Sequence, residues 1–90
     1  MKRVRAVVSG TVQGVFYRAS LCEEANSLGL RGWVQNLPTG EVEWLAEGPE
    51  DKLNKLIEWS MEGPETADVS GVLAHWRDAT EEFSTFEIRR

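Results

Sequence analysis

The stretch from residue 8 to residue 18 constrains this chain more than any other part of it. An apolar strand pattern leads to two glycines, Gly10 and Gly14, and the chain then enters an amphipathic segment through Arg18. Glycines at a strand-to-helix corner allow unusual backbone angles and let a ligand approach the main chain closely. Successive amides in such a turn can converge on one oxyanion, helped by the positive end of the following helix. The stretch therefore predicts an anion-binding loop, in which Arg18 adds a planar, charged phosphate-binding group.

The two glycines alone would also fit a tight turn that binds no ligand. Two longer motifs favour a ligand-binding loop. The first resembles a signature of the acylphosphatase family and reads Gly10-x-Val12-Gln13-Gly14-Val15-x-Tyr17-Arg18. The second resembles the other signature of that family, follows at the expected distance, and reads Gly32-Trp33-Val34-Gln35-Asn36-x-x-x-Gly40-x-Val42-x-x-x-x-x-Gly48. Family members usually carry Phe or Met just before the arginine, where this chain has Tyr17. A phenol buried there needs a partner for its hydroxyl.

The resemblance implies hydrolysis of the carboxyl–phosphate bond of small acyl phosphates, giving a carboxylate and inorganic phosphate with no metal ion or other cofactor. A carboxylic acid ordinarily has a pKa of about 4, so the carboxylate departs without a general acid. The resemblance also implies that the Arg18 guanidinium holds the phosphate and that Asn36 orients the attacking water. Further phosphate contacts are expected from the main-chain amides of Gln13, Gly14, Val15, Phe16, Tyr17 and Arg18.

Hydrophobic periodicity and turn residues predict five strands and two helices. The strands are expected at residues 3–9, 30–36, 41–47, 67–77 and 83–89, and the helices at 17–28 and 49–61. This order predicts an α+β, ferredoxin-like split βαβ fold: two helices on one face of an antiparallel sheet, with a short strand added at the C-terminus. The acylphosphatase resemblance covers the whole chain and implies the same fold. We expect residues 1–90 to form a single domain, with Gly71 at a candidate β-bulge.

The charge balance narrows the classes of partner. Ten Lys and Arg stand against fifteen Asp and Glu, for a net charge of −5, which argues against non-specific nucleic-acid binding. An anionic substrate is still compatible, because charges beyond about 8–10 Å are screened by salt. No apolar run reaches the roughly 18 residues of a membrane helix, and the start of the chain lacks a signal-peptide pattern. We therefore expect a soluble, cytoplasmic monomer with a small-molecule substrate and neither a nucleic-acid nor a membrane partner.

Two alternatives stay open at this point. A noncatalytic module that binds phosphate or acyl phosphate would use the same loop, as in the related first domain of some hydrogenase maturation proteins, although this chain is short for a larger assembly. An RNA-binding domain would share the split βαβ topology, because fold does not fix function. Such a domain needs basic and aromatic residues on its third strand, whereas residues 41–47 carry three acids.

The remaining reactive and aromatic residues are interpreted as structural. The single cysteine, Cys22, excludes an internal disulfide, fits a reducing compartment and lacks the Cys-x5-Arg phosphatase motif. His75 is the only histidine and has no evident Ser or Cys partner. Trp33 and Trp44 lie on strands that flank the predicted hairpin turn, which favours cross-strand packing over a base-stacking platform. The sequence shows no nucleotide-binding loop and no metal-ligand spacing.

Overall fold

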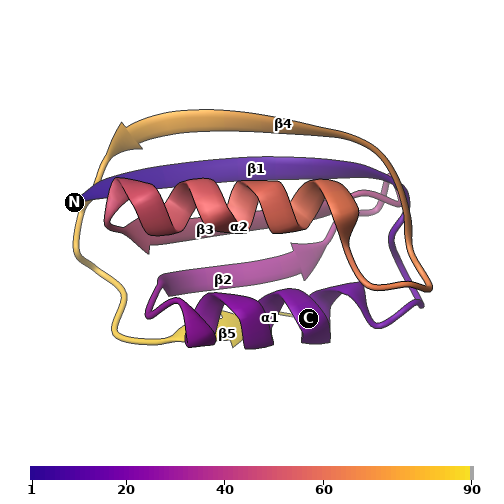
Figure 1. Cartoon of the computed structure of the whole chain (residues 1–90), viewed down its shortest axis with the longest axis horizontal. Helices are drawn as coiled ribbons and strands as arrows, with labels where there is room; N and C mark the ends of the chain where they lie inside the picture. Colours follow the sequence, from indigo (N-terminus) through magenta and orange to yellow (C-terminus); the bar gives the residue numbers. More distant parts are fainter. Residues whose placement is uncertain (90) are drawn as a thin grey trace.

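The computed structural model describes residues 1–89, in which two helices cover one face of a five-stranded sheet (Figure 1). In chain order the elements are β1 (Lys2–Thr11), α1 (Tyr17–Ser27), β2 (Arg31–Asn36), β3 (Val42–Gly48), α2 (Glu50–Glu62), β4 (Asp68–Asp78) and β5 (Phe86–Ile88). The predicted order of strands and helices is confirmed, although the last strand is shorter than expected. Within residues 1–89, no helix is both long and apolar enough to span a bilayer.

The strand order across the sheet is β4-β1-β3-β2-β5, and only the last pairing departs from the predicted antiparallel sheet. β1 pairs antiparallel with β3 and β4, and β2 pairs antiparallel with β3, whereas β5 runs parallel to β2. The reason lies in the connection. β4 ends beside the start of β1, at the end of the sheet where β2 also begins, and residues 79–85 cross that end (Figure 1). A strand that then joins the free edge of β2 runs in the same direction as β2, so the sheet is mixed.

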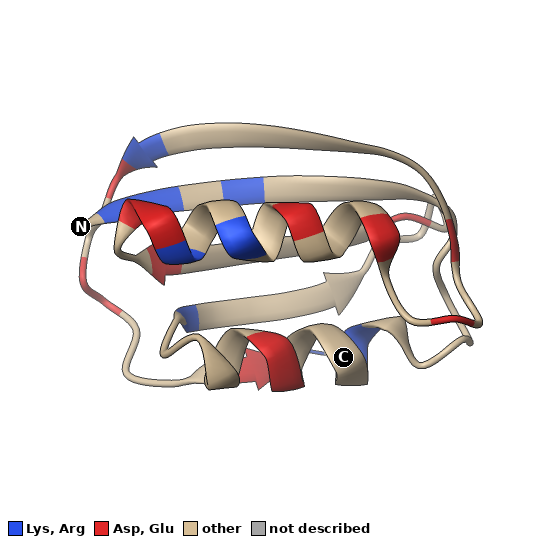
Figure 2. Ribbon diagram, in the orientation of Figure 1, with Lys and Arg blue, Asp and Glu red and all other residues tan. Residues whose placement is uncertain are grey.

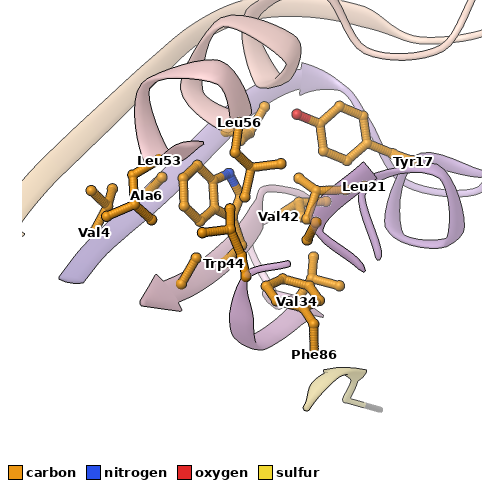
Figure 3. Close-up of a cluster of buried hydrophobic side chains, with 14 of the residues drawn as sticks. Val4, Ala6, Tyr17, Leu21, Val34, Val42, Trp44, Leu53, Leu56 and Phe86 are labelled. Carbon is orange, nitrogen blue, oxygen red and sulfur yellow. The ribbon is translucent and has the colours of Figure 1, made fainter. Parts of the chain in front are cut away.

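The core lies between the helices and the sheet face that they cover. Alternate residues of the central strands point into it, and Trp44 of β3 is fully buried among Leu53 and Leu56 of α2 and Leu21 of α1 (Figure 3). The other members of the buried cluster come from β1, α1, β2, β3, β5 and the segments that follow β1 and α1: Val4, Ala6, Val8, Val12, Tyr17, Ala25, Leu30, Val34, Val42, Ala46 and Phe86. This packed layer fixes the ends of β1 and β2, from which the site is built.

The register of β2 and β3 corrects the expectation that Trp33 and Trp44 pack on each other. Trp33 pairs with Leu45, and Trp44 pairs with Val34. Because side chains alternate between the two faces of a sheet, the two indoles point to opposite faces. Trp44 enters the core, while Trp33 lies on the uncovered face beneath the guanidinium of Arg89, 4.6 Å from the centre of its ring.

A bulge interrupts the pairing of β1 and β4 just before the loop. Ser9 pairs with Gly71 and Gly10 pairs with Val69, which leaves Ser70 as the extra residue. The glycine that this geometry requires is Gly10 rather than Gly71. Gly10 has a φ of 121°, and a Cβ on it would lie 2.1 Å from the Asp68 carbonyl oxygen. The first glycine of the motif therefore lets two backbones approach closely where the chain turns toward the site.

A polar cluster on the uncovered face ties down the segment that leads to β5. The buried Glu47 carboxylate accepts hydrogen bonds from Arg3 Nε at 2.6 Å and from the backbone amides of Thr80 and Glu81 at 2.8 Å each. Burial by itself raises the pKa of Glu47, but the hydrogen bonds from Thr80, Arg3 and Glu81 together bring the pKa below its ordinary value. Ionised Glu47 therefore stabilises the path of residues 79–85.

Glu47→Gln is expected to lower the free energy of unfolding at pH 7 by about 1–3 kcal/mol, because the amide cannot satisfy the same donors. The folded-state pKa of Glu47 lies below its unfolded-state value, so its stabilisation is present above the unfolded pKa and is lost as pH falls through the folded pKa. Urea unfolding at pH 7 and at about pH 3 should show the difference between the two chains shrinking in acid. An equal difference at both pH values would contradict a role for the charge.

Candidate active site

The loop between β1 and α1 has the backbone shape of an anion-binding turn. Gly14 and Phe16 both adopt left-handed angles, with φ of 70° and 62°. Glycine reaches this region freely, whereas for phenylalanine it is strained. Phe16 is also the N-cap of α1, so the turn delivers the chain directly into the helix.

The backbone amides of this turn are free to bind a ligand. Among the residues that the structure describes, no amide from residue 13 to residue 19 donates to a backbone carbonyl; the first such bond beyond the loop runs from Ser20 to the Phe16 carbonyl at 3.0 Å. The first turn of α1 contains no acidic residue, and Figure 2 shows the acids of this helix farther along it. Unpaired amides at a helix N-terminus, without a nearby negative charge, favour an anion.

An open pocket of about 510 Å³ lies at this loop. Of the predicted site residues, it is lined by Gly14, Phe16, Tyr17, Arg18 and Asn36, and its other lining residues are Val12, Ala19 and Ile88. The structure thus brings the predicted arginine and asparagine to one pocket although they belong to different motifs. The side chains of Gln13 and Val15 do not line it.

Gln13 instead joins the loop to the hairpin that follows Asn36. Its side-chain nitrogen donates to the carbonyl oxygens of Leu37 at 2.9 Å and Glu41 at 2.8 Å. On the other side of the loop, Thr66 donates its hydroxyl to the Val15 carbonyl at 2.7 Å. These contacts hold the loop from both sides and fix its position relative to Asn36.

Asn36 is the last residue of β2 and faces the helix-covered side of the sheet. It pairs with Val42, which is buried in the core, and paired residues of antiparallel strands point to the same face. Its own side chain is exposed at the rim of the sheet. A polar amide at this position can accept from a bound molecule and donate to it.

Arg18 lies in the first turn of α1 and is oriented by the C-terminal strand. Its Nη1 donates to the Arg89 carbonyl at 3.0 Å, just beyond the end of β5. The sequence did not predict this contact, nor Ile88 in the pocket wall, because neither belongs to a motif. The only available signal was the alternation of Phe86 and Ile88 in the last predicted strand, which places both on one face.

A sequence profile of the acylphosphatase family matches residues 4–88. The chain belongs to the acylphosphatase family. An acylphosphatase from Methylococcus capsulatus is 47% identical over 100% of this chain and 98% of its own length. Among solved structures, the Bacillus subtilis acylphosphatase has a TM-score of 0.96 at 36% identity with both chains fully covered, and the Coxiella burnetii one a TM-score of 0.91 at 44% identity over 97% of this chain and 90% of that one.

Acylphosphatases hydrolyse acyl phosphates, and this chain is a hydrolase of that class. The match over the whole length of its relatives favours this activity over the RNA-binding and noncatalytic alternatives. The acylphosphatase pocket contains neither Cys22 nor His75. Cys22 is half-buried in α1, where burial raises the pKa of its thiol, and His75 pairs with Arg5 on the uncovered face of the sheet.

Tyr17 stands where the acylphosphatase motif usually has Phe or Met, and its buried hydroxyl has a hydrogen-bond partner in the structure. Its ring is buried against Trp59, with ring centres 5.5 Å apart, and its hydroxyl donates to the Ser60 carbonyl at 2.8 Å. The usual helical donor to that carbonyl would be residue 64, which is Pro64 and has no amide hydrogen. The phenol thus replaces a bond that the end of α2 lacks, and burial raises the pKa of Tyr17.

Tyr17→Phe is expected to lower the free energy of unfolding by about 1–3 kcal/mol, because it leaves the Ser60 carbonyl without a donor in a buried site. The ring and its packing on Trp59 are retained, so the change isolates the hydroxyl. Urea unfolding of the two chains at pH 7 measures the difference. Equal unfolding midpoints would mean that the hydroxyl does not cap α2.

Proposed function

We propose that the loop amides of residues 13–18 and the guanidinium of Arg18 hold the phosphoryl group of a small acyl phosphate, while Asn36 orients the attacking water. The observation that carries this proposal is the shared pocket, in which Arg18 and Asn36 meet beside amides that have no backbone acceptor. The phosphoryl group would lie at the N-terminus of α1. The attacking water would lie between it and the end of β2.

The reaction requires little covalent chemistry from the protein. The water oxygen forms a bond to phosphorus, and the bond from phosphorus to the carboxyl oxygen breaks. The leaving group departs as a carboxylate, and because its conjugate acid has a pKa of about 4, protonation is unnecessary. The proton of the water passes to the phosphate product or to solvent. What the protein must supply is position and stabilisation of negative charge on the equatorial oxygens.

The loop and Arg18 supply that stabilisation. Preorganised amides and a guanidinium do not need to reorganise as charge develops, which makes them more effective than water. One N–H of Arg18 is used by the Arg89 carbonyl, and within residues 1–89 the other donors of its fork have no hydrogen-bond partner that would compete with phosphate oxygens. For this reason we propose that turnover needs no metal ion.

Asn36 would act through both ends of its amide. The carbonyl oxygen accepts a hydrogen bond from the attacking water, and the amino group donates to the water or to a phosphate oxygen. Gln13 supports this role indirectly, because its bonds to Leu37 and Glu41 link the phosphate loop to the hairpin next to Asn36. The water and the phosphoryl group would thereby be held in line.

The test is hydrolysis of benzoyl phosphate in the presence of excess chelator, followed by the loss of its ultraviolet absorbance. We expect the same rate with and without the chelator. A rate that is lost on chelation and restored by Mg²⁺ would contradict metal-independent turnover.

A cytoplasmic location and a monomeric state stay predictions, and size-exclusion chromatography with light scattering tests the monomeric state.

A further inference from the structure

Phe16 is the most exposed large apolar side chain of the described residues, with 77% of its surface accessible. Its backbone is also in the left-handed region, which is unfavourable for a residue other than glycine. The ring therefore adds little to the core while its backbone is strained. Strain and exposed apolar surface that coincide at a pocket point to a ligand. Phe16 lines the same pocket as Arg18 and Asn36.

Ile88 provides a second apolar side chain at this pocket. Ile88 is the last residue of β5 and is 37% exposed, whereas Phe86, two residues earlier on the same strand, is buried. Its position is fixed by the pairing with β2: Ile88 pairs with Val34, and the next residue, Arg89, donates its amide to the Val34 carbonyl at 2.8 Å. The Arg89 carbonyl in turn accepts the bond from Arg18. The apolar wall and the phosphate-binding guanidinium are thus held by one short segment.

We propose that Phe16 and Ile88 form an acyl-binding subsite, which favours acyl phosphates with aromatic or branched apolar acyl groups over acetyl phosphate. This inference rests on the proposed function, because the loop and Arg18 must fix the phosphate end for the acyl group to reach this wall. The pocket lining contains no acidic residue, and it includes two further apolar residues, Val12 and Ala19, besides Phe16 and Ile88. An apolar acyl group would cover surface that is otherwise in contact with water.

The test compares kcat/KM for benzoyl phosphate and for acetyl phosphate in the unmodified chain, Phe16→Ala and Ile88→Ala. The intrinsic reactivity of each substrate is the same for every variant, so the change in the ratio reports the subsite alone. We expect Phe16→Ala to lower the benzoyl-to-acetyl ratio about tenfold and Ile88→Ala several-fold. Phe16→Leu keeps an apolar contact and should retain most of the ratio. An unchanged ratio in both alanine variants would overturn the proposal.

A matched control is Leu73→Ala. Leu73 is 62% exposed on β4, on the uncovered face and outside the pocket. Its replacement removes a comparable apolar side chain and should leave the ratio as it is in the unmodified chain. A fall as large as that in Phe16→Ala would overturn the proposal, because the effect would then not depend on the pocket.

A binding measurement separates the subsite from the proposed catalytic roles. Benzoylphosphonate and acetylphosphonate keep the acyl and anionic groups but cannot be hydrolysed to phosphate, and calorimetry gives their dissociation constants. We expect tighter binding of benzoylphosphonate, by a ratio that falls about tenfold in Phe16→Ala. If the chain bound both with this dependence but turned over neither acyl phosphate, the catalytic roles would be wrong and the subsite would stand. Equal ratios in the unmodified chain and Phe16→Ala would overturn the subsite.

Discussion

Arg18→Gln is expected to lower kcat/KM for benzoyl phosphate by at least about 10²–10³-fold, the typical effect of losing one preorganised donor to a developing oxyanion. The effect should lie at the upper end because glutamine removes a full charge together with a two-pronged donor. Inorganic phosphate, as a competitive inhibitor, should bind the variant much more weakly. Steady-state kinetics with phosphate inhibition measures both quantities.

Two further variants sharpen this result. Arg18→Lys keeps the charge but cannot donate to the Arg89 carbonyl and to a phosphate from one planar fork, so we expect it to recover only part of the activity. Arg77→Gln removes an exposed arginine of β4 that does not line the pocket, and its kcat/KM should stay within about twofold of the unmodified chain. If Arg18→Gln kept more than a tenth of the activity, Arg18 would not be the main phosphate-binding side chain.

Asn36→Ala is expected to lower kcat by about 10²–10³-fold, because it removes the donor and acceptor that we propose act on the reacting water. Asn36 is exposed at the end of β2, so its replacement should leave the core and the phosphate loop in place. The inhibition constant of inorganic phosphate should therefore change little. This division of roles is tested by measuring kcat and phosphate inhibition on the same preparation.

The matched control for this variant is Asn54→Ala, which removes an exposed asparagine from α2 outside the pocket and should leave kcat unchanged. If Asn36→Ala weakened phosphate binding as severely as Arg18→Gln, the two residues would share one role, and the water-orienting role of Asn36 would be wrong.

The parts of the site predicted from the sequence are those encoded in local patterns. Gly14 and Arg18 belong to one strand-to-helix turn, and Asn36 ends a strand with a hairpin turn after it. Such features depend on residues close in the chain, and the structure places Gly14, Arg18 and Asn36 at one pocket. Their roles in binding and catalysis stay predictions.

The rest depends on contacts between distant segments. Gln13 reaches the carbonyls of Leu37 and Glu41, and no local pattern shows which hairpin atoms face its side chain. β5 runs parallel to β2 because residues 79–85 cross one end of the sheet, so the positions of Ile88 and Arg89 follow from topology. The prediction that Trp33 and Trp44 pack on each other across the strands was wrong for a related reason. A shift of one residue in strand register moves a side chain to the other face of the sheet.

Binding of phosphate at the loop between β1 and α1 is tested most directly by an NMR titration of the ¹⁵N-labelled chain with inorganic phosphate. We expect the largest changes in amide chemical shift within residues 13–18, and we expect Arg18→Gln to abolish them at the same phosphate concentration. A second hollow, lined by Lys2, Glu50, Trp76, Arg77 and Asp78, lies outside the proposed site and offers an internal comparison. Changes centred there, with the amides of residues 13–18 unmoved, would contradict the proposed phosphate site.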